Sequence, residues 1–170
     1  GNHITHFRMR QRGSLKLLFL TAQQTSEERI MLIEFDESLI TGNEMIDDQH
    51  KELISRISAF VSACEEGESK TKAIKMLDYL DEYTNFHFSA EEKLQEEVAY
   101  PGIAQHKEKH EEFKTTVKEL YEYLEDLEGP TDAFVEQVKE KVVDWLFYHI
   151  KTFDCSVAEY IFYQKRPGTV

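Results

Sequence analysis

Glycine and proline are scarce in this chain of 170 residues, which contains seven and three of them. A β-sandwich or barrel needs many tight turns, so this scarcity argues against those folds and favours long helices with few breaks. The chain also lacks an apolar run approaching the roughly 20 residues that span a bilayer, so we expect no membrane association. Two cysteines, Cys64 and Cys155, are too few for a disulfide framework, which predicts a cytoplasmic protein.

Positive charge is scarce as well, because the chain has 20 basic and 33 acidic residues, for a net charge of −13. Such a balance disfavours nucleic acids and anionic membranes as partners. Residues 1–30 carry a net charge of +3 and residues 31–170 carry −16. We therefore expect residues 1–30 to be an N-terminal extension, either artificial or a linker from a longer protein, and residues 31–170 to form the domain. A signal peptide is disfavoured, because the apolar cluster at 15–20 is shorter than the roughly 7–15 residues that such a signal needs.

Helical periodicity begins near residue 46 and continues through the rest of the domain. Apolar residues recur every three or four positions in four segments, which are separated by breaks at Gly67, Pro101-Gly102 and Gly129-Pro130. Thr131 is a suitable N-cap for the last segment. Connections of about four or five residues make successive helices antiparallel. The sequence therefore predicts an all-α protein, an up-down-up-down antiparallel four-helix bundle.

Polar side chains interrupt the apolar stripes of all four helices. Every histidine after residue 31 lies on a stripe, and two carboxylates accompany them: His50, His87, Glu91, His106, His110, His149 and Asp154. A lone histidine on an apolar face is usually a hydrogen-bonded core residue. Hydrogen bonds cannot satisfy this whole set cheaply, because an unpaired buried carboxylate costs several kcal/mol. A metal site removes the cost, since metal ions neutralise carboxylates and bind imidazole nitrogen.

The spacing of these residues supports a metal site. Residues four apart share a helix face, so the pair on the second helix and the pair on the third each present two donors to one centre. Asp154 follows His149 by five residues, about 140° around an α-helix. We therefore expect Asp154 at or beyond the end of the last helix, where a bend returns its carboxylate. Other acidic pairs, such as Glu92 and Glu96, share faces that we expect to be solvated.

Several segments together resemble the hemerythrins, most closely the bacterial ones, over about residues 31–163. Residues 32–36, ahead of the first helix, are similar to the N-terminal arm of that family. The segments that carry the resemblance are Ile46-Asp47-Asp48-Gln49-His50, His87-Phe88-Ser89-Ala90-Glu91-Glu92, the spaced pair His106 and His110, and the spaced set Trp145, His149, Ile150 and Asp154.

The resemblance implies a bundle with an N-terminal arm and a non-haem di-iron site that binds dioxygen. Three histidines would bind one iron, and two would bind the other, which keeps an open position. The two carboxylates would bridge the irons together with an oxo or hydroxo group. The residues in these roles are His106, His110 and His149 for the first iron, His50 and His87 for the second, and Glu91 and Asp154 as bridges.

Reversible dioxygen binding for carriage, storage or delivery is therefore the leading hypothesis. We do not expect an enzyme, because five neutral imidazoles donate less charge than the carboxylate-rich di-iron sites do. An oxygen- or redox-sensing domain with a signalling module upstream stays open, as does a di-iron oxidase, and so does the oligomeric state. One departure is Gln95, where relatives often have Met. If its side chain faces the site, we expect a less stable oxygen-bound form.

Overall fold

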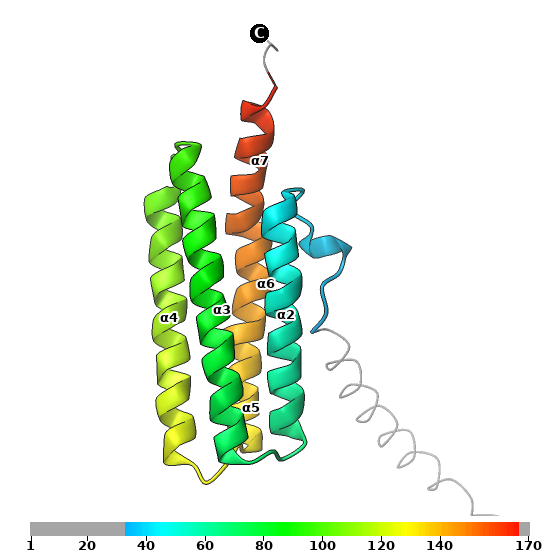
Figure 1. Cartoon of the computed structure of the whole chain (residues 1–170), viewed down its shortest axis with the longest axis vertical. Helices are drawn as coiled ribbons and strands as arrows, with labels where there is room; N and C mark the ends of the chain where they lie inside the picture. The colour runs from blue at the N-terminus through cyan, green and yellow to red at the C-terminus, as the bar shows by residue number, and fades with distance from the viewer. Residues whose placement is uncertain (1–32, 167–170) are drawn as a thin grey trace, which may run out of the picture. The chain divides into compact units, whose positions relative to one another are not determined.

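The structure, a computed structural model, describes residues 33–166, and the regular elements in this range are all helical. Three long helices, α2 (Glu44–Glu65), α3 (Lys70–Glu97) and α4 (Ile103–Asp126), lie alongside a fourth column (Figure 1). That column consists of five consecutive segments: α5 (Asp132–Val138), η2 (Lys139–Asp144), α6 (Trp145–His149), η3 (Ile150–Asp154) and α7 (Cys155–Gln164).

The four columns form the expected antiparallel bundle. Helix α3 packs against both α2 and α4, and α5 contacts α2 and α4, so the fourth column closes the arrangement. None of the helices within residues 33–166 is both long and apolar enough to cross a membrane. The expected extension at 1–30 lies outside the described residues.

Three of the α-helices, α2, α3 and α5, begin at side-chain caps. Helix α2 starts at Glu44, two residues before the predicted start, because Asn43 caps it. The predicted cap at Thr131 is confirmed. Each cap oxygen accepts a hydrogen bond from a first-turn backbone N–H: Asn43 from Ile46 at 3.1 Å, Ser69 from Lys72 at 3.3 Å and Thr131 from Phe134 at 3.1 Å.

The arm ahead of α2 is fixed by one buried carboxylate. It includes the short helix η1 (Glu37–Leu39), whose Leu39 is fully buried. Asp47 accepts hydrogen bonds from the Thr41 backbone N–H at 2.8 Å, the Thr41 hydroxyl at 2.7 Å and the Gly42 N–H at 3.1 Å. These bonds tie the arm to the first turn of α2, just before the predicted ligand His50.

The core has an apolar cluster on either side of a polar layer. At one end, the rings of Phe60 and Phe134 meet edge to face at 6.3 Å among buried aliphatic side chains. At the other end, a smaller cluster joins Ile46, Val157 and Ile161. The buried histidines and carboxylates come between the two, so the bundle surrounds them with apolar packing.

Helix α3 ends with a residue in the left-handed region. Ala99 has a φ of +52°, and its backbone N–H donates to the Glu96 carbonyl at 3.1 Å. The next N–H, of Tyr100, donates to the Gln95 carbonyl at 2.9 Å. Glycine is the usual residue at such a helix end, because a Cβ is disfavoured at positive φ.

We therefore expect Ala99→Gly to raise the free energy of unfolding by about 0.5–1 kcal/mol, since relief of the left-handed strain exceeds the entropy that glycine adds to the unfolded chain. The matched control is Ala59→Gly at an exposed position inside α2, which should lower the same free energy by about 1 kcal/mol. Urea denaturation measures both. Equal losses in the two variants would contradict the strain at Ala99.

Candidate metal centre

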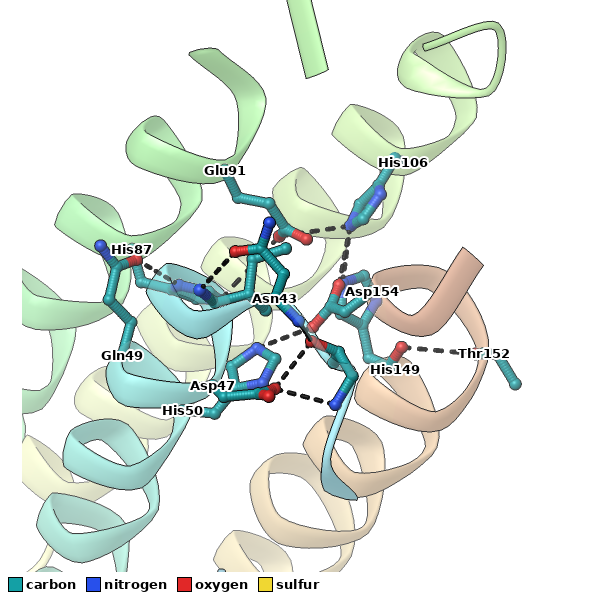
Figure 2. Close-up of polar contacts among 12 residues, drawn as sticks. Asn43, Asp47, Gln49, His50, His87, Glu91, His106, His149, Thr152 and Asp154 are labelled. Carbon is teal, nitrogen blue, oxygen red and sulfur yellow. Dashed lines mark hydrogen bonds and ion pairs between the residues drawn. The ribbon is translucent and has the colours of Figure 1, made fainter. Parts of the chain in front are cut away.

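The structure brings all seven predicted site residues into one buried layer of the bundle. Figure 2 labels His50, His87, Glu91, His106, His149 and Asp154 in this layer. Each helical column contributes at least one of them, and none is more than 1% exposed. The set comprises His50 on α2, His87 and Glu91 on α3, His106 and His110 on α4, His149 on α6 and Asp154 on η3.

The position of Asp154 differs from the sequence prediction. The helix does not end or bend away there, because the column continues to Gln164. Residues 150–154 instead form a π-helical turn, in which hydrogen bonds join residues five apart rather than four. A turn closed in this way returns the fifth residue to the same face. The turn therefore places Asp154 beside His149, with 3.0 Å between Oδ1 and Nε2.

The donor atoms form two groups that share Asp154. The larger group contains Glu91, His106, His110, His149 and Asp154, and the smaller contains His50, His87 and Asp154. Within each group the donor atoms lie within 4.8 Å of one another.

The two oxygens of Asp154 face different groups. Oδ1 lies 3.0 Å from Nε2 of His106, and Oδ2 lies 2.9 Å from Nε2 of His50. Glu91 occupies a similar middle position, since its Oε2 is 3.4 Å from Nε2 of His110 and 3.9 Å from Nε2 of His87. Both carboxylates are therefore placed between the two sets of histidines.

Burial and mutual repulsion keep two of the imidazoles, those of His87 and His110, neutral. Burial lowers the pKa of His87 to about 3, and the nearby His50 adds to the shift. Burial likewise lowers the pKa of His110 to about 2, and His106 and His149 lower it further. At neutral pH these two rings therefore carry a free nitrogen lone pair, which is the form that binds a metal ion.

The two carboxylates are pushed in opposite directions. Burial raises the pKa of Glu91 well above its ordinary value, and the neighbouring Asp154 raises it further. Burial also disfavours the charge on Asp154, but contacts with His149, His106 and His50 more than offset this and hold its pKa well below the ordinary value. Without a cation, the pair therefore favours one charged and one neutral carboxyl group.

The donor set fits metal ions. Among the described residues, several buried donor atoms make no hydrogen bond: Nε2 of His50, His87 and His110, and both carboxylate oxygens of Glu91 and Asp154. Such atoms cost free energy unless something binds their lone pairs. Metal–ligand bonds of about 2.1 Å place neighbouring octahedral ligands about 3 Å apart. The shortest separations between donor atoms, 2.9–3.0 Å, match that value.

Hydrogen bonds on the outer nitrogens orient two of the histidines. Nδ1 of His87 donates to the Gln49 side-chain oxygen at 2.9 Å, and Nδ1 of His110 donates to Glu92 at 2.8 Å. The expectation that Glu92 is merely solvated surface is wrong, because its side chain is 22% exposed and points back to the site. A ligating histidine needs an acceptor for its second ring nitrogen. A carboxylate directly after the predicted ligand Glu91 could therefore have been predicted as such an acceptor.

Gln95 also faces the site, since it is fully buried and its side-chain nitrogen lies 3.0 Å from Nδ1 of His106. The expected effect of this residue on the oxygen-bound form stays a prediction.

Aromatic rings pack flat against two of the ligands. Phe88 stacks on His110 with ring centroids 3.8 Å apart and an angle of 6°. His149 lies between Trp145 at 4.5 Å and Phe153 at 5.2 Å, with angles of 12° and 6°. These stacks fix the ring planes and keep water from the histidine faces.

Comparison with known proteins agrees with this geometry. The family model described as the hemerythrin HHE cation binding domain matches residues 41–154. The chain belongs to the hemerythrin family. A myohemerythrin from Sipunculus nudus is 32% identical over 121 residues, which are 71% of this chain and 86% of that protein. A bacteriohemerythrin from Stenotrophomonas maltophilia (strain R551-3) is 28% identical over 130 residues, which are 76% of this chain and 82% of the relative.

A solved crystal structure of a mutant protein shares the fold. Its TM-score is 0.59 at 24% identity, and the match covers 68% of this chain and 86% of the other. The hemerythrin family comprises oxygen-binding proteins with a non-haem di-iron centre, so family membership and the buried donor cluster point to the same kind of site.

We expect the metal-free protein to lose stability as the pH falls from 7 to 5. His87 and His110 stay neutral in the folded state, whereas unfolded histidines take up protons below pH 6.5. The unfolded state therefore binds more protons in this window, and each histidine costs about 2 kcal/mol of stability at pH 5. Urea denaturation of chelator-treated protein at several pH values measures the loss.

Glu91 provides a matched check. Its raised pKa means that the folded state binds a proton above the ordinary range of a carboxyl group, which opposes the histidine effect. Glu91→Gln should therefore make the loss of stability on acidification steeper. A metal-free protein that is equally stable at pH 7 and pH 5 would contradict the neutral, buried state of the two histidines.

Proposed function

We propose that the seven buried residues hold two iron ions. The larger group supplies three histidines to one ion, and the smaller group supplies His50 and His87 to the other. Glu91 and Asp154 would bridge the two ions, together with an oxo or hydroxo group. The observation that carries this assignment is that the two oxygens of Asp154 contact histidines of different groups. Oδ1 is 3.0 Å from Nε2 of His106, and Oδ2 is 2.9 Å from Nε2 of His50.

We infer that the site binds dioxygen reversibly, for carriage, storage or delivery. When bound, an iron pair supplies the electrons for reversible binding of dioxygen. The chain's own contribution is an unequal donor set, because the side with His50 and His87 has one histidine fewer and so leaves room for an exogenous ligand. The neutral imidazoles donate little charge, which favours reversible binding over oxidation chemistry and supports a protein that is not an enzyme.

The surroundings support the same function. The ligand rings are buried against Phe88, Trp145 and Phe153, and exclusion of water protects a bound oxygen molecule from loss by side reactions. A sensing role would use the same chemistry and would differ in the partner that responds to it. The two cysteines are unpaired, which favours a reducing compartment, and we propose the cytoplasm.

Anaerobic reduction followed by oxygen titration tests the proposal, with metal analysis of the same sample. We expect two irons per chain and a visible absorption band that develops with oxygen and disappears under vacuum. One zinc per chain, or no metal, would exclude the di-iron site. Rapid catalytic consumption of a substrate by the reduced protein would instead favour an enzyme.

A ligand variant tests the division of the donors. We expect His110→Ala to lose iron from the three-histidine side and to lower the thermal stability, because its neighbours keep their buried lone pairs without an ion to bind them. The matched control is Phe113→Leu, a fully buried residue on the same helix that is outside the donor groups. This control should lower stability but keep both irons. Unchanged iron content in His110→Ala would show that the ligand assignment is wrong.

A further inference from the structure

Gln95 is the buried polar side chain of this layer that the proposed iron ligands do not explain. It lies on α3, one turn after Glu91, and is fully buried. Its side-chain nitrogen is 3.0 Å from Nδ1 of His106. Its side-chain oxygen is buried and makes no hydrogen bond to any described residue. A buried amide with one half satisfied costs free energy, so the residue calls for a functional account.

Gln95 presents a hydrogen-bond donor to its histidine, whereas Gln49 and Glu92 present acceptors to theirs. His87 and His110 each face an oxygen, from Gln49 and Glu92 respectively. An acceptor at Nδ1 requires the proton on that nitrogen and leaves Nε2 free for a metal ion. These two histidines are therefore already in the metal-binding tautomer.

His106 is arranged in the opposite way. Because the amide nitrogen of Gln95 donates to Nδ1, the proton of the neutral ring sits on Nε2, which is the atom that faces the donor cluster. Nε2 lies 3.0 Å from Oδ1 of Asp154 and 3.0 Å from Nε2 of His149. In this state, Nε2–H of His106 donates to Nε2 of His149, and His106 offers the cluster no lone pair.

We propose that Gln95 is a positioning residue whose amide turns over when a metal ion binds His106. The inference rests on the proposed metal site. Binding at Nε2 requires the ring proton to move from Nε2 to Nδ1, so no proton is gained or lost by the ring. The amide then rotates by half a turn, and its side-chain oxygen accepts a hydrogen bond from Nδ1–H.

An amide suits this task because its two ends have similar shape and opposite polarity. An apolar side chain supports neither tautomer, and an ionised carboxylate supports only the metal-bound one. Gln95 therefore stabilises both the metal-free and the metal-bound layer, and its orientation reports whether His106 is ligated. The outer partners of ligating histidines commonly contribute 10–100-fold to metal affinity.

The test uses the full chain and zinc alone, because zinc is redox-inert and leaves the spectra diamagnetic. Long-range proton–nitrogen NMR of the histidine rings identifies which nitrogen carries the proton. We expect the His106 proton on Nε2 in the metal-free protein and on Nδ1 in the zinc-loaded protein. The proton of His110 should be on Nδ1 in both states.

The variant is Gln95→Met, which keeps the length of the side chain and removes both polar atoms. Zinc affinity at the three-histidine side, measured by competition with a chelator, should fall at least tenfold. The Nδ1 proton of His106 should also exchange faster with solvent. The matched control is Gln49→Met, which should weaken the side that contains His87 and leave the His106 signals unchanged.

Different results would exclude the metal site and the rotation of the Gln95 amide. If the wild-type protein takes up no zinc through His106, the assignment of the metal site fails. If zinc binds His106 but the tautomer is the same with and without metal, the turnover of the amide is excluded. If the two methionine variants lower the affinity of the same site equally, Gln95 acts only through packing and the inference is wrong.

Discussion

The structure depends on one electrostatic constraint, which is the burial of five imidazoles and two carboxylates in a single layer between apolar clusters. Most of these groups have no access to water, and the inward-facing atoms of His50, His87, His110, Glu91 and Asp154 lack hydrogen bonds. The protein relieves part of the cost by keeping the rings of His87 and His110 neutral and by pushing the pKa values of the two carboxyl groups in opposite directions. A bound cation would offset the rest of this free-energy cost, and that gain would favour its binding.

Much of this arrangement could be predicted from the sequence, because helical periodicity assigns each residue to a face. The stripes located four helices, and the polar interruptions located all seven residues of the layer. The confirmed cap at Thr131 shows that local chemistry also sets helix starts. Asp154 was harder, because α-helical geometry puts it on another face from His149. Only the π-helical turn at 150–154 reconciles their spacing with their contact.

The hydrogen bonds around the layer could not be read from periodicity. Glu92 and Gln49 lie at the edge of the buried face, where a helical wheel cannot tell whether a long side chain turns inward or outward. Asp47 is similar, because its three bonds depend on the path of the arm before α2. Which way such residues point is decided by partners distant in sequence, and these become visible only when the helices are packed together.

The stacked rings also hold the histidines of the larger donor group in place. His110 is held by Phe88 and Glu92, and His149 is held between Trp145 and Phe153. These side chains have already lost their rotational freedom, so ligating an ion costs them little further entropy. His50 on the other side has no hydrogen bond on its outer nitrogen. His110 and His149 are therefore more nearly fixed in advance than His50 is, so binding a ligand there would cost less further side-chain entropy.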